Sequence, residues 1–243
     1  MSYIYNTFIY HPLYNALIWI VAHIPGHDAG LAVILLTCLV KFILLPLSKK
    51  SVVTQLKMKQ LQPELTKIQE KYKDNRAELS QRLMAFYKEN KLNPFSGLFL
   101  IILQIPIIIA LYRVFNNGGF QSLNAALLYS WNTIPEHINT LFLGLIDLTH
   151  RNIVLSVLVG ISQFIQARLA IPPAAPAPTD GSKPSLGSDF ARSMSMQVKY
   201  VLPIFVFFIS LSFSSVLSIY WITSNLFAIG QELYFRKTIK KTA

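Results

Sequence analysis

One cation inside an apolar stretch is the most informative chemical group in this sequence. Lys41 lies in the run 29–47, whose other residues are almost all apolar. An ionised side chain at the centre of a membrane helix costs about 2.5–3.5 kcal/mol on insertion scales, so it usually faces a polar cavity. Thr37 lies one helical turn earlier and points to the same side. The pair predicts a polar site within the membrane.

Polar side chains also interrupt the other apolar stretches. Each could simply bond to a neighbouring helix, and Lys41 could extend its ammonium to the nearest lipid headgroups. The apolar stretches contain no carboxylate except Glu232, near the end of the last one. We therefore favour a wet groove in which a substrate supplies the missing counter-ion. Its expected lining is Thr37, Lys41, Gln104, Gln163, Gln166, Ser224 and Asn225.

Catalytic and metal-binding motifs are absent from the sequence. There is no nucleophile elbow, no zinc-protease motif and no phosphate-binding glycine loop. The only cysteine, Cys38, cannot form an internal disulfide. The histidines have no metal-ligand spacing, although coordination by two or three of them is a weak alternative. We expect no enzyme activity, no catalytic residue, no metal and no cofactor.

The composition is that of a membrane protein. Of 243 residues, 53% are hydrophobic and 14% are charged, whereas soluble domains average about 25% charged. The net charge of +11 would suit nucleic acid, an anionic membrane surface or a ribosome. The positions of the cations decide between these partners, and they indicate no specific nucleic acid.

The apolar stretches predict an all-α polytopic membrane protein with five transmembrane helices. The stretch from Tyr200 to Phe235 is too long for one helix and has a serine-rich middle, so it should contain two short spans joined by a tight turn. The expected spans are 29–47, 94–115, 153–171, 200–213 and 216–235. The expected connections are an extracytoplasmic interfacial helix (1–28), a cytoplasmic coiled-coil hairpin (48–93), an extracytoplasmic loop (116–152), a cytoplasmic linker (172–199) and a basic tail (236–243).

Cations set the expected orientation. Segments 48–93, 172–199 and 236–243 hold most Lys and Arg residues, and all three fall on one side of the five-span topology. By the positive-inside rule that side is cytoplasmic, which places the N-terminus outside and the C-terminus inside. A sixth span within 1–28 is the rival interpretation, and the distribution of cations argues against it.

The hairpin is predicted by apolar residues at alternating steps of three and four, from Met58 to Tyr72 and again from Leu79 to Phe86. Asn75 and Glu78 have the spacing of a helix N-cap and its partner. Pro63 should kink or restart the first arm. The basic residues are candidates for binding a partner, although a solvated positive-inside face would carry the same charges. They are Lys57, Lys59, Lys67, Lys71, Lys73, Arg76 and Arg82.

Three segments in this order resemble the YidC/Oxa/Alb family of membrane protein insertases. They are LTCLVKFILLPLSKKS with KMKQLQPEL, LMAFYKENKLNPFSGLFLIILQIPIIIALY, and VLPIFVFFISLSFSSVLSIYWITSNLFAIGQE. The resemblance covers nearly the whole chain and corresponds to the minimal five-span bacterial form. It implies a multi-pass protein of the bacterial cytoplasmic membrane.

The resemblance also implies roles for particular residues. Lys41 stands where the family usually has an Arg, at the centre of a hydrophilic groove open to cytoplasm and lipid. Thr37 and either Tyr220 or Trp221 match positions on the path by which a substrate helix leaves. Lys keeps the charge of Arg but loses its planar fork for carboxylates. The implied partners are nascent membrane proteins, membrane lipids, the Sec translocon, and the ribosome or targeting factors.

These features predict an insertase and chaperone that works without ATP. A transporter or channel for an anionic solute is an alternative, but the outer half of the first span, 29–36, is wholly apolar and offers no polar path. A Sec-associated assembly factor is a further alternative, for which Lys41 would be dispensable.

Overall fold

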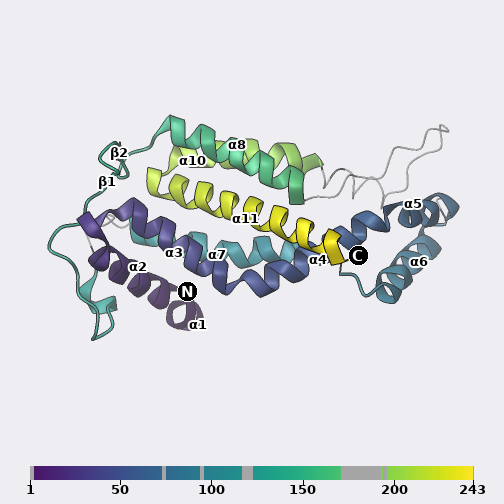
Figure 1. Ribbon diagram of the computed structural model, residues 1–243, viewed down its shortest axis with the longest axis horizontal. Coiled ribbons are helices and arrows are strands. Elements are labelled where there is room, and N and C mark those ends of the chain that lie inside the picture. The colour runs from purple at the N-terminus through teal and green to yellow at the C-terminus, as the bar shows by residue number, and fades with distance from the viewer. Residues whose placement is uncertain are drawn as a thin grey trace.

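The computed structural model is an elongated bundle of helices (Figure 1). It describes residues 3–72, 75–93, 96–116, 123–170, 193 and 196–242. For residues 76, 96–103, 115, 116 and 239–242 it describes the backbone alone. Long helices run side by side along the long axis, with α5 and α6 at one end and the strands β1 and β2 at the other.

Helix α3 (Ala29–Ile43) carries Lys41 and is followed at a bend of 64° by α4 (Leu45–Gln60). Asp28 caps the start of α3, because its Oδ1 accepts hydrogen bonds from Gly30 N at 2.7 Å and Leu31 N at 3.0 Å. Pro46 lies in the first turn of α4 and removes one backbone donor, which favours the break at Leu44. The helix expected over 29–47 thus ends at Ile43, and Lys41 lies in its last turn.

The other long helices are close to their expected ranges. They are α7 (Ser96–Asn116), α8 (Ile153–Ala170), α10 (Leu202–Ser212) and α11 (Ser215–Thr242). The break between α10 and α11 lies where the serine-rich patch predicted a turn. Two boundaries differ: α11 continues beyond residue 235 through most of the expected tail, and a short π-helical segment, η5 (Gln197–Val201), begins within the expected linker. Residues 172–192, 194 and 195 of that linker lie outside the described part.

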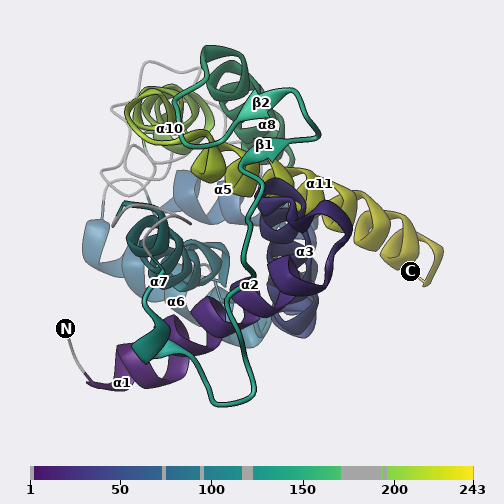
Figure 2. The ribbon, with the colours of Figure 1, turned by 90° about the vertical axis from the view of Figure 1, so that its left-hand side faces the viewer.

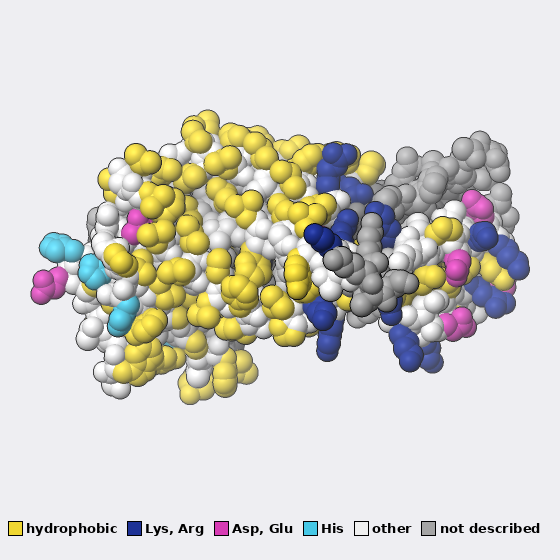
Figure 3. Space-filling model, in the orientation of Figure 1, with side chains coloured by type: hydrophobic (Ala, Val, Ile, Leu, Met, Phe, Trp, Pro, Cys, Tyr) yellow, Lys and Arg dark blue, Asp and Glu magenta, His cyan; other side chains and the backbone are white. Residues whose placement is uncertain are grey.

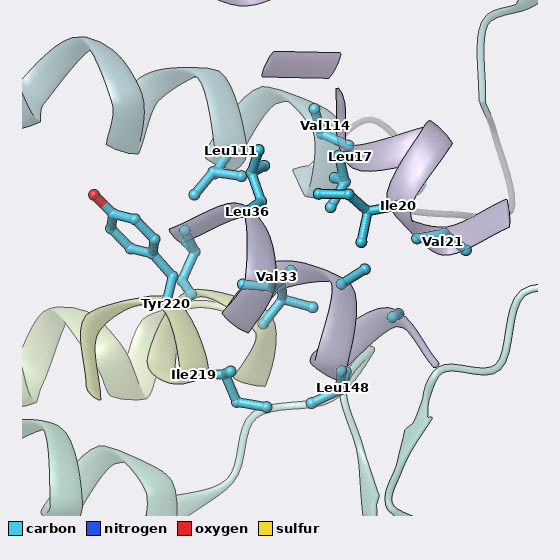
Figure 4. Packing of buried hydrophobic residues seen from close by; sticks show 14 of the residues in the cluster. Leu17, Ile20, Val21, Val33, Leu36, Leu111, Val114, Leu148, Ile219 and Tyr220 are labelled. Atoms are coloured by element: carbon cyan, nitrogen blue, oxygen red, sulfur yellow. The ribbon is translucent and has the colours of Figure 1, made fainter. Parts of the chain in front are cut away.

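Helix α11 is central to the bundle, because it packs against both α8 and α3, while α10 covers α8. Serine hydroxyls link these helices: Ser210 Oγ lies 3.0 Å from Ser156 Oγ and 2.8 Å from Ser218 Oγ. Such short polar contacts are a common means of joining helices in a bilayer. Apolar side chains from α2, α3, α7 and α11 fill the neighbouring core (Figure 4).

The N-terminal segment joins that core along one side. It comprises α1 (Tyr3–Tyr5), a π-helical turn η1 (Asn6–Tyr10) and α2 (His11–His23). Leu17, Ile18 and Val21 are fully buried, and α2 packs against α3 and α7. The side chains of Tyr3 and Phe8 stay exposed, whereas the hydroxyl of Tyr5 donates to Pro106 O at 3.2 Å. That this segment lies at the membrane interface, rather than crossing the bilayer, remains a prediction.

Short elements connect the helices at the end that carries the strands. They are the 3-10 turns η2 (Pro25–His27) and η4 (Ala125–Leu127) and the antiparallel strands β1 (Leu141–Phe142) and β2 (Ile146–Asp147). The buried side chain of Asn15 holds the chain that follows η4. Its Nδ2 donates to Leu127 O at 2.9 Å, and its Oδ1 accepts from Tyr129 N at 2.7 Å.

At the opposite end, α5 (Gln62–Lys71) and α6 (Arg76–Glu89) contact each other. The chain restarts as α5 with Pro63 in its first turn, as predicted. Asn75 is the N-cap of α6, also as predicted, since its Oδ1 accepts from Glu78 N at 3.2 Å. Helix α4, however, packs on α7 and α11 rather than forming an arm with α6.

Among the described residues, α8 is the one helix that is long and apolar enough to cross a bilayer by itself. The bent pair α3 and α4 meets the same criterion when taken as one span. Gln104–Val114 and Gln197–Ser212 are shorter apolar helical stretches. The count of five spans therefore stays a prediction.

Candidate functional site

A small pocket lies between α3, α7 and α11, and it brings four of the predicted polar residues together. Its polar lining is Thr37, Lys41, Gln104 and Tyr220. Its apolar lining is Leu13, Leu36, Val40, Ile107 and Leu111. The pocket has room for about one water molecule. We call it the Lys41 pocket.

The half-buried ammonium of Lys41 has one hydrogen bond in this pocket, to a neutral acceptor. Its Nζ donates to Gln104 Oε1 at 3.2 Å, which joins α3 to α7. Within the ranges that the structure describes, no carboxylate oxygen lies within 4.0 Å of it. Lys41 lies in the last turn of α3, where the negative end of the helix dipole stabilises its positive charge. Lys41 is therefore a cation without a counter-ion among the described residues.

The two hydroxyl groups of the pocket differ in their availability. Thr37 Oγ1 donates to Val33 O at 2.6 Å, so its proton is used within α3. Tyr220 is almost completely buried, and its hydroxyl has no hydrogen-bond partner among the described residues. Figure 4 shows its ring reaching from α11 toward α7, beside Leu36 and Leu111. Its hydroxyl is thus a spare donor on the wall of the Lys41 pocket.

The remaining predicted groove residues lie elsewhere. Gln163 and Gln166 are half-buried on α8, where Nε2 of the first lies 3.4 Å from Oε1 of the second. Asn225 Nδ2 donates to Ser162 Oγ at 3.1 Å and joins α11 to α8. Ser224 is buried beside it in sequence. None of these four lines the Lys41 pocket.

The two residues predicted for a substrate exit path have different surroundings. Tyr220 faces the Lys41 pocket, whereas Trp221 is half-buried and packs against the edge of the apolar core. Leu13 of α2 also lines the pocket and was missed by sequence reasoning, because nothing in the spacing of the N-terminal segment indicates which helices it contacts.

A comparison with protein families decides the identity of this arrangement. The family model described as "60Kd inner membrane protein" matches residues 20–242. The chain belongs to the 60Kd inner membrane protein family. The resemblance read from the sequence segments is thereby confirmed.

Curated relatives of this chain carry the name "Membrane protein insertase YidC". Examples come from Francisella tularensis subsp. novicida (strain U112), subsp. mediasiatica (strain FSC147) and subsp. holarctica (strain LVS). Each is 37% identical over 218 residues, which is 88% of this chain and 34% of the relative. The chain thus spans about a third of the length of these relatives.

The basic residues predicted to bind a partner lie on α4, α5 and α6. Lys57, Lys59, Lys67, Lys71 and Arg82 are all exposed. Lys71 Nζ and Arg82 Cζ lie 5.4 and 5.3 Å from the centre of the Tyr72 ring. Lys73 lies outside the described residues, and Arg76 begins α6 with its side chain outside them. On the face seen in Figure 3, the cations extend from the middle of the molecule to the α5–α6 end, and the apolar body beyond them shows none.

Proposed function

We propose that this protein inserts membrane proteins into the bilayer and helps them fold, through a groove that holds the charge of Lys41 and needs no ATP. Membership of a family whose curated relatives are named insertases supports the general activity. The observation that supports the role of Lys41 is its single hydrogen bond to a neutral acceptor.

The physical task is to carry a polar flank across the bilayer. Leu, Ile, Phe and Val each favour insertion by about 0.3–0.6 kcal/mol at mid-helix, so the apolar part of a substrate needs no motor. An acidic flank costs free energy in hydrocarbon, and the ammonium of Lys41 offsets part of that cost. A potential negative inside favours outward movement of an acidic residue by about 2.3 kcal/mol per charge per 100 mV.

The pocket must open for this to happen. A peptide flank is far larger than the space beside Lys41, so the flank has to displace Gln104 from the ammonium and separate α3 from α7. The spare hydroxyl of Tyr220 is then available as a second donor to the flank. The substrate helix leaves between α3 and α11, past Thr37 and Tyr220 or Trp221.

The cellular setting is part of the same proposal. The protein lies in the bacterial cytoplasmic membrane with its N-terminus outside and its C-terminus in the cytoplasm. Nascent membrane proteins and lipids are its partners, and the basic α5–α6 end meets the Sec translocon, the ribosome or targeting factors.

The test is insertion of a short single-span substrate into liposomes that hold the purified protein and a membrane potential. The substrate is made in two forms, with an acidic or an uncharged outward-going flank. For the acidic form we expect Lys41→Arg to retain activity, and Lys41→Ala and Lys41→Glu to lose about tenfold or more, which corresponds to 1.4 kcal/mol or more. The uncharged form should respond much less.

A matched control distinguishes the effect of the charge at Lys41 from the effect of losing any one cation. Lys50→Ala removes an exposed cation from α4 that lies outside both the Lys41 pocket and the set of partner-binding candidates, and it should leave insertion unchanged. Equal activity of all Lys41 variants would show that the electrostatic mechanism is wrong while leaving the insertase activity standing. Absence of insertion above empty liposomes would contradict the activity itself.

A further inference from the structure

The turn between β1 and β2 exposes three leucine side chains on the surface of the protein. Leu141, Leu143 and Leu145 are 43%, 61% and 83% exposed. Gly144 completes the turn, so residues 141–145 carry no charge. Turns of this kind usually use Asn, Asp, Ser or Gly, which bond to water or to the local backbone. We call residues 141–145 the leucine tip.

The conformation of the leucine tip is held by specific hydrogen bonds. Leu143 has φ of +51°, which is uncommon for a large side chain, and Gly144 has φ of +73°. Gly144 N donates to Leu141 O at 3.0 Å, and Leu145 N donates to Phe142 O at 3.0 Å. Leu143 N donates to Asp28 Oδ2 at 2.9 Å. A strained conformation persists only where its surroundings determine it, so the outward display of these leucines is a built feature.

The leucine tip is mounted on the first turn of α3. Asp28 uses its other carboxylate oxygen to cap α3, so one side chain holds both the helix and the tip. Phe142 packs directly over Gly30, where a Cβ atom would lie 2.2 Å from Phe142 Cδ2. Ala29 N donates to Asn139 O at 2.9 Å, which ties the preceding chain to the same turn. The position of the leucine tip along the axis of α3 is therefore fixed by the first turn of that helix.

The position of the leucine tip favours lipid as its occupant. Figures 1 and 2 show β1 and β2 beside the beginning of α8, at the end opposite α5 and α6. α8 is the described helix that can cross a bilayer alone, and it opens with the exposed side chains of Ile153 and Val154. Apolar side chains cover the body in Figure 3 up to the end where histidines and acidic groups begin. The tip thus lies at the same end of the molecule as the apolar start of α8, with the exposed residues His150 and Arg151 between them in the chain.

We propose that the leucine tip is a membrane anchor, inserted at the boundary between headgroups and acyl chains of the leaflet opposite the α5–α6 end. Apolar side chains gain free energy by leaving water, and partial insertion at this boundary requires no crossing of the bilayer. Because the tip is fixed to the first turn of α3, it holds that helix at a constant depth. About 18 Å of helix separates Ala29 from Lys41, so the anchor also sets the depth of the cation.

A single nitroxide label on the full chain tests this proposal. Cys38→Ser removes the only cysteine, and Leu145→Cys then carries the label in liposomes of phosphatidylethanolamine and phosphatidylglycerol. Collision rates are measured with oxygen, which concentrates in lipid, and with a water-soluble nickel chelate. Glu136→Cys, in the same loop, is the aqueous control, and Ile161→Cys, exposed on α8, is the lipid control.

We expect the ratio of oxygen to nickel collisions at Leu145 to exceed that at Glu136 several-fold and to approach that at Ile161. A ratio equal to that at Glu136 would place the tip in water and overturn the proposal. Low collision rates with both reagents would mean that protein covers the tip, as in contact with a second copy, and would overturn it as well. The label reports lipid contact whether or not a substrate is inserted, so the result is independent of the proposed function.

Discussion

Lys41 and Gln104 lie on different helices and meet across 3.2 Å, with the ammonium as donor and the amide oxygen as acceptor. A neutral acceptor satisfies one proton of the ammonium without neutralising its charge. The arrangement keeps a cation in a largely apolar pocket and leaves that charge available for an incoming anion. Its consequences can be tested on both partners.

Gln104→Glu should slow the insertion of acidic substrates while stabilising the resting state. The new carboxylate would form an ion pair with Lys41, and an acidic flank would then have to displace a charged competitor. We expect insertion of the acidic-flank substrate to fall about tenfold, equivalent to 1.4 kcal/mol. Gln104→Met has similar size and replaces the amide oxygen with an uncharged, weakly accepting thioether, and it should insert better than Gln104→Glu. Equal rates for the two variants would contradict the role of the free charge.

Asn225 and Ser162 should be coupled in stability. The bond from Asn225 Nδ2 to Ser162 Oγ joins α11 to α8 at 3.1 Å, and both residues are buried. Double-mutant cycles in a helical membrane protein average about 0.6 kcal/mol per such pair, with a maximum near 1.7. A cycle of Asn225→Ala and Ser162→Ala, measured by reversible unfolding in bicelles, should give a coupling in this range. Strictly additive effects would show that the bond contributes nothing.

Gly30→Ala should destabilise the leucine tip. The added Cβ would overlap the ring of Phe142, so either the ring or the first turn of α3 must move. Overpacking of this kind costs about 1–3 kcal/mol. The matched control is Gly230→Ala on α11, where a Cβ would meet nothing within 4 Å. Thermal unfolding of the two variants in one detergent should separate them, and Phe142→Ala should restore part of the loss in Gly30→Ala. No such rescue would mean that another contact limits the site.

Asp147 should remain ionised to lower pH than an ordinary aspartate. Thr149 donates to its Oδ1 from the hydroxyl at 2.6 Å and from the backbone at 2.9 Å, and these bonds lower the pKa of the carboxyl below its ordinary value of 3.8. His150 lies 3.0 Å away and acts in the same direction. A lowered pKa in the folded state stabilises the loop above about pH 4, and this contribution disappears as the pH falls through the folded-state pKa.

Carbon NMR of the labelled carboxyl measures this pKa directly. We expect a midpoint below 3.8 in the native chain and a shift upward in Thr149→Val, which removes the hydroxyl donor. A midpoint at or above 3.8 in the native chain would show that the hydrogen bonds do not persist in solution.

Local features of this protein follow from the sequence alone. The N-cap of α6 at Asn75, the restart of α5 at Pro63 and the break between α10 and α11 depend on neighbouring residues, and the structure confirms each of them. The helical repeat likewise places Thr37 and Lys41 on one face of α3. Family membership is also readable from the order of the sequence segments.

Only the tertiary structure decides which faces meet. Gln104, Gln163 and Asn225 looked equivalent in sequence, because each is a polar residue in an apolar stretch. Packing brings Gln104 to Lys41, leaves Gln163 on α8 and commits Asn225 to Ser162. The burial of Tyr220 likewise depends on contacts between helices. A repeat along the chain orients side chains about their own helix axis, whereas the rotation of one helix against another is set by the close packing of all of them.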